Sequence, residues 1–155
     1  MSITLDQVRR LLDPEEPDYT TAARFGRQLL PHLQSLIRSG NPNYASKATY
    51  LASLVEDERA VEILRDAARN PSPLVRVAAA GGLRNVRRPA AAGVLMGLLD
   101  DLDNGVRKMA IKSSAGRPDA ALLAKISDLT RRDPSPAIRT LASRVLGQPR
   151  GRGIA

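Results

Sequence analysis

The sequence is poor in the residues that carry metal, redox and aromatic-pocket chemistry. Its 155 residues include no cysteine, no tryptophan, one histidine and one phenylalanine. Without cysteine the chain forms neither disulfides nor thiolate metal sites, and one histidine cannot build a histidine metal cluster. We therefore expect no metal and no cofactor. Because aromatics make up 3% and hydrophobic residues 43%, the interior must be filled by Leu, Val, Ile and Ala, which suit close helix packing.

Long hydrophobic runs are also missing. No stretch reaches the about 18 uninterrupted apolar residues expected of a membrane span. The segment from Met1 to Asp6 lacks the basic and apolar regions of a signal peptide. We therefore expect a cytoplasmic protein that makes no membrane contact, and the chain length fits one domain.

Positive charge is concentrated in the second half of this basic chain. The 24 Lys and Arg exceed the 16 Asp and Glu, which gives a formal net charge of +8. Residues 1–70 carry nine basic and ten acidic residues, whereas residues 71–155 carry fifteen and six. Any electrostatic attraction of a polyanion is therefore expected in the C-terminal half.

A repeat with a period of 31 or 32 residues runs through most of the chain. One apolar column consists of Tyr44, Val75, Val106 and Ile138. Four residues further along stands a column of alanines, namely Ala48, Ala79, Ala110 and Ala142. A spacing of four places both columns on one helical face. Periods of 20–50 residues are typical of stacked helical units.

A second helix in each unit is indicated by further columns. The first of these is Leu33, Leu64, Leu95 and Ile126, and the second is Leu36, Ala67, Leu98 and Leu129. Polar N-caps are expected where the other helix begins, at Asn41, Ser72, Asp103 and Ser135, three of which precede a proline. The pattern predicts helices near 4–12, 18–25, 27–39, 43–55, 57–69, 73–85, 89–100, 104–115, 119–132 and 136–146.

These helices predict an all-α fold, an α-α superhelix of about four to five helical hairpins. It would form a single domain over residues 1–147, with units near 4–40, 41–71, 72–102 and 103–134 and a partial unit at 135–147. The first pair departs from the pattern, as terminal repeats that cap a stack commonly do. Residues 148–155 lack periodicity, so we expect a flexible tail.

The repeated pattern Pro-x-Val-Arg-x-x-Ala, followed by Leu-x-x-Leu on the next helix, resembles bacterial HEAT repeats of the phycobilisome-lyase type. The resemblance covers about residues 27–147 and implies a HEAT-like solenoid. Proteins of that family serve as adaptors and scaffolds, as bilin lyases and, in a relative, as DNA-alkylation-repair glycosylases. Function therefore has to be argued from site residues.

The column Arg76, Arg107 and Arg139 forms the most regular polar feature of the repeat. Similar HEAT arrays imply that such an arginine pairs with an acidic residue at a repeat junction. Acidic residues for this role stand at Asp101, Asp103 and Asp133. The alternative is a ligand-binding stripe of guanidinium groups.

The helix predicted at 89–100 carries a small, apolar patch. Gly93, Met96 and Gly97 occupy positions that are polar in the preceding unit, so a partner helix can approach closely there and a flexible Met can adapt to it. Arg65 and Arg69 flank this patch. The pattern favours a non-enzymatic protein-binding scaffold or adaptor that uses the curved surface of the stack. The alternative for this patch is a central helix that is more deeply buried or covered by the N-terminal segment.

A basic surface gives the rival hypothesis of nucleic-acid or polyanion binding, and the alternative for these residues is an ordinary solvated basic face. Its candidate residues are Arg84, Arg87, Arg88, Lys108, Lys112, Arg117 and Arg144. Single-strand binders stack bases on aromatic side chains, and this half of the chain has none. An unidentified protein is therefore the partner we expect first, with nucleic acid second.

The hypothesis of an enzymatic activity finds little support in the sequence. A glycosylase or bilin lyase would need a sizeable aromatic-lined pocket, but all aromatics, namely Tyr19, Phe25, Tyr44 and Tyr50, lie in the first third. His32 stands alone, without a nucleophile or second ligand nearby. The acidic segment 100–105 is not an EF-hand, because Ile111 occupies the position of the required Glu. We expect no enzyme.

Overall fold

The computed structural model describes residues 2–147, and over this range the chain is helical without any strand. The α-helices are α1 (Leu5–Leu12), α2 (Tyr19–Ala23), α3 (Leu30–Arg38), α4 (Pro42–Ala52), α5 (Glu58–Ala67), α6 (Pro73–Gly82), α7 (Ala90–Leu98), α8 (Asn104–Ser114), α9 (Ala120–Arg132) and α10 (Pro136–Leu146). Two 3-10 helices, η1 (Gly26–Leu29) and η2 (Leu83–Asn85), extend α3 and α6. The all-α prediction is confirmed. The segment 148–155, predicted as a tail, lies outside the described residues.

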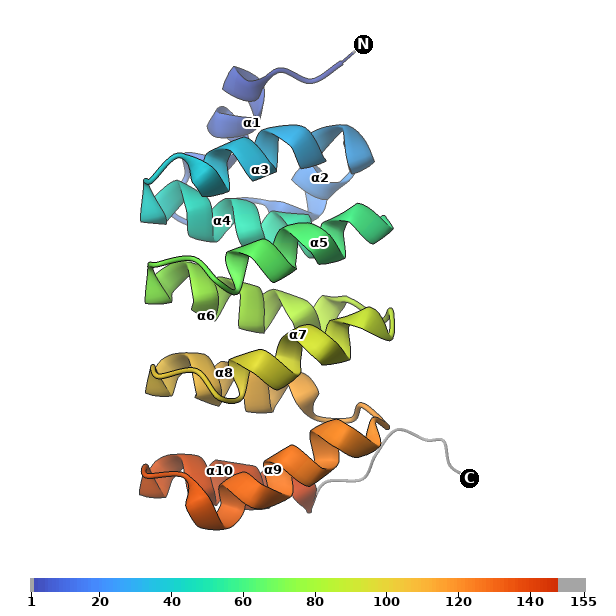
Figure 1. Ribbon diagram of the computed structural model, residues 1–155. Coiled ribbons are helices and arrows are strands. Elements are labelled where there is room, and N and C mark those ends of the chain that lie inside the picture. Colours follow the sequence, from blue (N-terminus) through green and yellow to red (C-terminus); the bar gives the residue numbers. More distant parts are fainter. Residues whose placement is uncertain (1, 148–155) are drawn as a thin grey trace.

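The helices stack in two layers along one axis (Figure 1). One layer contains α3, α5, α7 and α9, and the other contains α4, α6, α8 and α10. The short helix α1 covers one end of the stack, and α9 and α10 form the other end. This arrangement confirms the predicted α-α superhelix. None of the described helices is long and apolar enough to cross a membrane.

Capping residues and prolines set the helix boundaries. Asn41, Asp103 and Ser135 each accept a hydrogen bond from a backbone N–H in the first turn of the following helix, as predicted. Ser72 also occupies an N-cap position, but its side chain makes no capping bond. Pro31 lies in the first turn of α3, and the residues before it form η1 instead of a longer α-helix, because proline offers no N–H to continue the bonding.

The layer of α4, α6 and α8 packs more closely than the layer of α5, α7 and α9. The alanine column explains this difference, since all four members, Ala48, Ala79, Ala110 and Ala142, are fully buried. The closest approach occurs at Gly82, where an added Cβ would lie 2.7 Å from Cβ of Ser53. Small side chains thus bring these backbones together, while the opposite layer stays more open.

The core follows the predicted register through the stack. Leu33, Leu64, Leu95 and Ile126 are all completely buried, which confirms the repeat. Buried residues form an N-terminal and a C-terminal cluster, and α5 and α6 contribute to both. Each hairpin therefore completes its core only against its neighbours.

Truncating a core column residue tests this register. We expect Leu95→Ala to lower the free energy of unfolding by about 2–5 kcal/mol, because it removes fully buried atoms and leaves a cavity. Urea denaturation followed by circular dichroism measures the change. A cost below about 0.5 kcal/mol, the range of surface substitutions, would contradict the register.

Two glycines provide a matched test of the close packing. Gly82→Ala should destabilise by about 1–3 kcal/mol, because the new methyl group collides with Ser53. Gly97→Ala, which meets no atom within 4 Å, should stabilise by up to about 1 kcal/mol through helix propensity. The two melting temperatures should move in opposite directions. An unchanged or higher melting temperature in Gly82→Ala would show that the contact with Ser53 does not limit the space at Gly82.

Candidate functional site

A groove of about 240 Å³ lies between α5 and α7 in the more open layer. It contains four of the five residues predicted for protein binding: Arg65 on α5, Arg69 just after the end of that helix, and Gly93 and Gly97 on α7. Ala68, Val94, Leu98 and Asp101 complete its lining. We refer to this feature as the α5–α7 groove.

The two glycines leave one wall of the α5–α7 groove bare. Both are exposed, both stand in ordinary helical backbone, and an added Cβ at either would meet nothing within 4 Å. The fold therefore does not require glycine at either position, although each costs a helix interior about 1 kcal/mol relative to alanine. They lie one helical turn apart and allow another backbone to approach α7.

Met96 lies outside the α5–α7 groove. It is half-buried and packs against the C-terminal core cluster, so it does not join the glycines in one patch. The sequence pattern grouped the three residues because each stands at a position that is polar in the preceding unit. Gly93 and Gly97 lie on nearly the same side of α7. Met96 points to a different side, because the three residues from Gly93 to Met96 advance the helix by less than one full turn.

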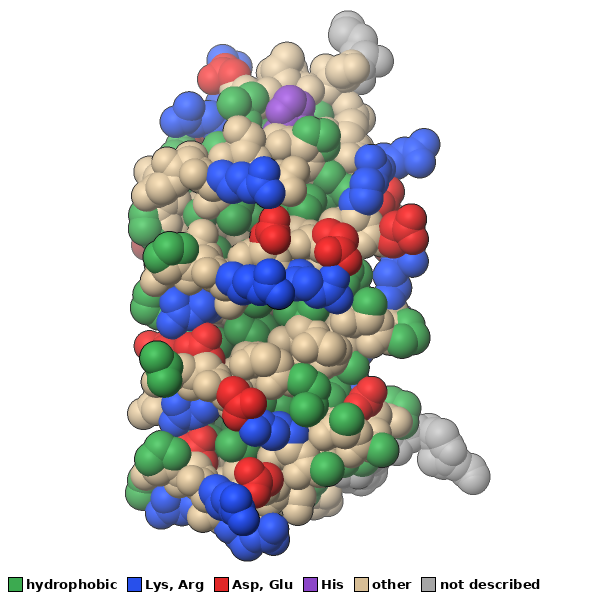
Figure 2. Space-filling model, viewed as in Figure 1, with side chains coloured by type: hydrophobic (Ala, Val, Ile, Leu, Met, Phe, Trp, Pro, Cys, Tyr) green, Lys and Arg blue, Asp and Glu red, His purple; other side chains and the backbone are tan. Residues whose placement is uncertain are grey.

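Charge is distributed unevenly around the groove. Arg65 pairs with Glu62 on its own helix, whereas Arg69 is exposed and makes no ion pair within the described residues. Figure 2 shows charged side chains gathered over α3 and α5, while the surface over α7 is largely uncharged. The two walls thus differ: one is cationic at its rim and the other is small and apolar.

A second groove, between α3 and α5, was not anticipated from the sequence. It has a volume of about 550 Å³ and an apolar base formed by Ile37, Ala45 and Ile63. Arg38 and Asp66 form an ion pair of 3.1 Å at its rim, and Arg69 lines both grooves. No single helix carries a signal for this groove, because its walls come from two repeat units.

The basic candidates fall into separate groups. Arg84, Arg87 and Arg88 are exposed and line a hollow of about 500 Å³ at the turn between α6 and α7. The same hollow is lined by Glu56 and Asp57 from the preceding turn. The acidic side chains offset part of the positive potential that these arginines were predicted to provide.

Arg117 has a structural role and is not a free cation beside that hollow. Its guanidinium donates hydrogen bonds to the backbone oxygens of Leu83, at 2.8 Å, and Val86. Burial lowers the pKa of Arg117, and nearby Asp119 partly counteracts this shift. The side chain thereby ties the α8–α9 turn to the end of η2.

The remaining basic candidates lie on the closely packed layer. Lys108 and Lys112 are exposed on α8, and Arg144 is exposed on α10. None of the three forms an ion pair within residues 2–147. The seven predicted polyanion-binding residues are thus distributed over the turn between α6 and α7, helix α8, the turn between α8 and α9, and helix α10.

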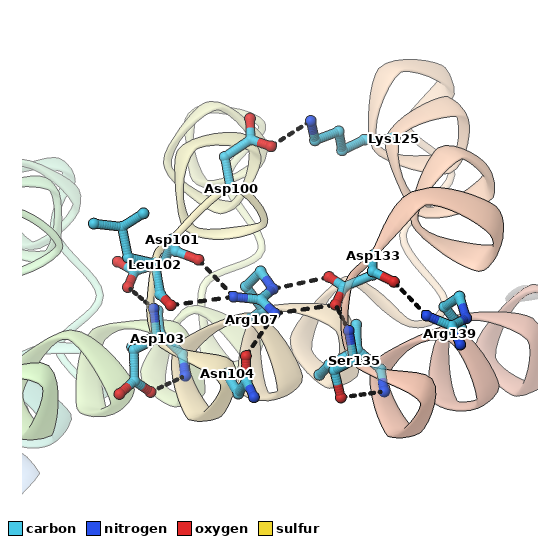
Figure 3. Close-up of polar contacts among 12 residues, drawn as sticks. Asp100, Asp101, Leu102, Asp103, Asn104, Arg107, Lys125, Asp133, Ser135 and Arg139 are labelled. Atoms are coloured by element: carbon cyan, nitrogen blue, oxygen red, sulfur yellow. Dashed lines mark hydrogen bonds and ion pairs between the residues drawn. The ribbon is translucent and has the colours of Figure 1, made fainter.

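The arginine column forms a ladder between repeat units (Figure 3). Arg76 donates from Nε and Nη2 to the carboxylate of Asp101, at 2.9 and 3.2 Å. Arg107 makes the same two bonds to Asp133, at 2.8 and 3.0 Å. The predicted pairing with junction acids is confirmed for these two rungs. Asp103 instead caps α8 through the N–H of Val106.

The Arg107–Asp133 rung is the more deeply buried of the two, with side chains only 8% and 1% exposed. Burial of the Asp133 carboxyl would by itself raise its pKa, but hydrogen bonds from Arg107 and from the N–H of Ser135 hold the pKa below its usual value. The carboxyl therefore stays ionised in the folded state. It joins the junction between α9 and α10 to Arg107 of α8.

The other sites considered from the sequence have structural contacts. His32 makes a 2.9 Å hydrogen bond between Nε2 and the backbone oxygen of Ile3. Asp100, which follows the end of α7, pairs with Lys125 on α9 (Figure 3). Among the residues described, no group of three acidic, Cys or His side chains is arranged to hold a metal ion.

Comparison with known proteins identifies the architecture. A family model for HEAT repeats matches residues 29–115. A solved structure, the complex of CpcE and CpcF of phycocyanin lyase from Nostoc sp. PCC7120, contains a chain similar to this one. The identity is 23% and the TM-score 0.69, over 82% of this chain and 85% of that chain. None of the curated proteins matches.

The pKa of Asp133 gives a prediction for the ladder. Because folding lowers this pKa, the ion pair contributes stability above the unfolded value of about 3.9 and loses it as pH falls through the folded value. Asp133→Asn should reduce the free energy of unfolding by about 3–5 kcal/mol at neutral pH, since it leaves Arg107 without its carboxylate. The difference from wild type should shrink in acid.

Denaturant unfolding at pH values above and below the unfolded pKa measures this dependence. Asp128→Asn serves as the control, because Asp128 pairs only with the exposed Arg132 at 3.2 Å and should cost less than about 1 kcal/mol. An Asp133→Asn penalty that is equal at both pH values would contradict the role assigned to its charge.

Proposed function

This chain belongs to the HEAT-repeat family, and from that premise we propose that it is a non-enzymatic, cytoplasmic protein-binding scaffold that receives a helix of a partner protein in the α5–α7 groove. The observation that carries this proposal is the pair of exposed glycines on α7. Neither is needed by the fold, and each weakens its helix. A partner backbone that packs against α7 would explain why glycine stands at these two positions.

The groove walls suggest the chemistry of the partner helix. Small side chains on the partner would face Gly93 and Gly97, where they allow the closest approach of two helices. An acidic side chain would face Arg69, which is exposed at the opposite wall. The partner is thus expected to be an amphipathic helix with a small-residue face and an acidic edge.

The distribution of the basic residues favours a protein over a nucleic acid. A phosphate backbone is best followed by a continuous cationic surface, but Arg87 and Arg88 share their hollow with Glu56 and Asp57. Arg117 is already engaged with backbone oxygens. These contacts leave polyanion binding as the alternative outcome of the test below.

An enzymatic role has less support from the site. None of the grooves and hollows described above is lined by an aromatic side chain, and neither Ser53 nor Ser72, which line two of them, hydrogen-bonds to a carboxylate or a histidine that could act as its base. The structural relative was solved as a complex of two proteins of phycocyanin lyase. Assembly with another protein is the part of that description that we extend to this chain.

Substitutions in the groove should separate the two functions. We expect Gly97→Glu to abolish capture of the partner, because its side chain fills the groove without disturbing the free protein. Gly97→Ala is the matched control and should retain more of the binding. The double variant Arg87→Glu and Arg88→Glu should leave binding unchanged. The measurement is quantitative mass spectrometry of proteins captured from host lysate, after circular dichroism has confirmed folding.

Salt dependence provides the second criterion. Binding in the α5–α7 groove should change little between low and high salt, whereas binding to phosphates falls by about 10³-fold or more when six to ten contacts are involved. Loss of binding in the arginine double variant, with Gly97→Glu still active, would replace the scaffold proposal by polyanion binding.

A further inference from the structure

The arginine ladder has a regular construction in its first two rungs. In each, Nη1 donates to two backbone oxygens of the arginine's own junction, while Nε and Nη2 grip an aspartate of the following junction. For Arg107 the backbone acceptors are Asp101, at 2.9 Å, and Leu102, at 3.3 Å. Arg76 repeats both sets of contacts one unit earlier.

The third rung is only half made. Arg139 donates from Nη1 to the backbone oxygen of Asp133 at 2.7 Å (Figure 3), which matches one of the two backbone contacts in each earlier rung. No carboxylate within residues 2–147 pairs with its Nε and Nη2. The guanidinium is thus held in position at one edge, and the edge that binds aspartate in the two earlier units is unused.

The repeat register defines the surface around this unused edge. Five positions that are buried in the unit formed by α7 and α8 are half-buried or exposed in the last unit, where they correspond to Leu123, Thr130, Arg139, Ser143 and Leu146. Two leucines and two hydroxyl side chains are therefore less buried in this last unit than their counterparts one unit earlier, and Ser143 donates from its hydroxyl to the backbone oxygen of Arg139. This mixture tolerates water, yet it offers apolar area to a hairpin that packs onto it.

Charge around α9 and α10 favours an acidic partner. Arg131, Arg132 and Arg144 are exposed on these two helices. The acidic residues there are Asp119, which caps the start of α9, Asp128, which is paired with Arg132, and Asp133, which is held by Arg107. A carboxylate approaching Arg139 therefore meets a positive potential.

We propose that the Nε and Nη2 edge of Arg139 is a carboxylate-binding site, through which a partner protein with a helical hairpin stacks on α9 and α10 and places an aspartate from its interhelical junction against Arg139. A second copy of this chain fits less well. Ser39 stands in the first junction at the position of Asp101 and Asp133, so the N-terminal hairpin offers no carboxylate there. This surface is separate from the α5–α7 groove and does not depend on its occupation.

Acetate provides the simplest probe of the site. In the full-length protein, the Nε–Hε resonance of Arg139 is followed by NMR during titration with sodium acetate, with sodium chloride as the ionic-strength control. We expect a saturable shift at Arg139 with an affinity about tenfold higher than at exposed Arg131, because the fork is preorganised for a bidentate contact. An equal or absent response at Arg139 would overturn the carboxylate site, including the case in which its own chain already fills it.

A peptide with the sequence of residues 119–147 tests the stacking of a hairpin. It contains Asp133 between the sequences of α9 and α10, as the proposed partner would contain its junction aspartate. We expect submillimolar binding to the full-length protein, weakened about tenfold by Asp133→Asn in the peptide. Arg139→Lys in the protein should weaken it similarly, because lysine keeps the charge but lacks the fork.

Arg131→Gln is the control, since it removes one exposed charge without touching the ladder. Wild-type-like melting of each variant protein establishes that the comparison concerns binding. Peptide binding that ignores both Asp133→Asn and Arg139→Lys would overturn the proposal. A response to acetate without any peptide binding would overturn the stacking and leave a site for small carboxylates only.

Discussion

The close approach of α4, α6 and α8 is the constraint on which the rest of the structure depends. Alanine at every copy of one column and glycine at position 82 let these backbones come together. Larger side chains, among them Leu64 and Leu95, fill the space between the two layers. The layer of α3, α5 and α7 is therefore spaced more widely, and its grooves follow from that spacing. The same packing that stabilises the stack thus creates the surface available for binding.

The arginine ladder fixes how successive hairpins sit on one another. A buried ion pair gains little net stability when compared with well-packed apolar residues, but breaking it leaves an unpaired charge. Arg107 and Asp133 meet this cost by satisfying both groups with further hydrogen bonds to backbone atoms of the junctions. The ladder therefore specifies the alignment of units more than it adds to their stability. Its regularity also makes the open edge of Arg139 recognisable.

Binding chemistry on this protein is divided among surfaces of different character. The α5–α7 groove combines a bare helix wall with the exposed cation of Arg69, which suits a packed helix. The end of the stack combines a preset guanidinium with a half-apolar face, which suits an added hairpin. The rim formed by Arg84, Arg87 and Arg88 is the most basic feature in the sequence, but its hollow also contains acidic side chains. Position relative to neighbouring units, more than charge alone, decides what each surface can bind.

The sequence by itself determined the period, the core columns, most N-caps and the pairing of junction arginines with aspartates, because these depend on spacing within one helix or between identical units. Only the tertiary structure decided that Met96 turns away from the α5–α7 groove, that Arg117 binds the oxygens of Leu83 and Val86, and that a groove opens between α3 and α5. Each of these depends on how far apart two different units stand and on which way a side chain points between them. A repeat pattern fixes the faces of its helices, but the distances between those faces are set by the side chains that pack there.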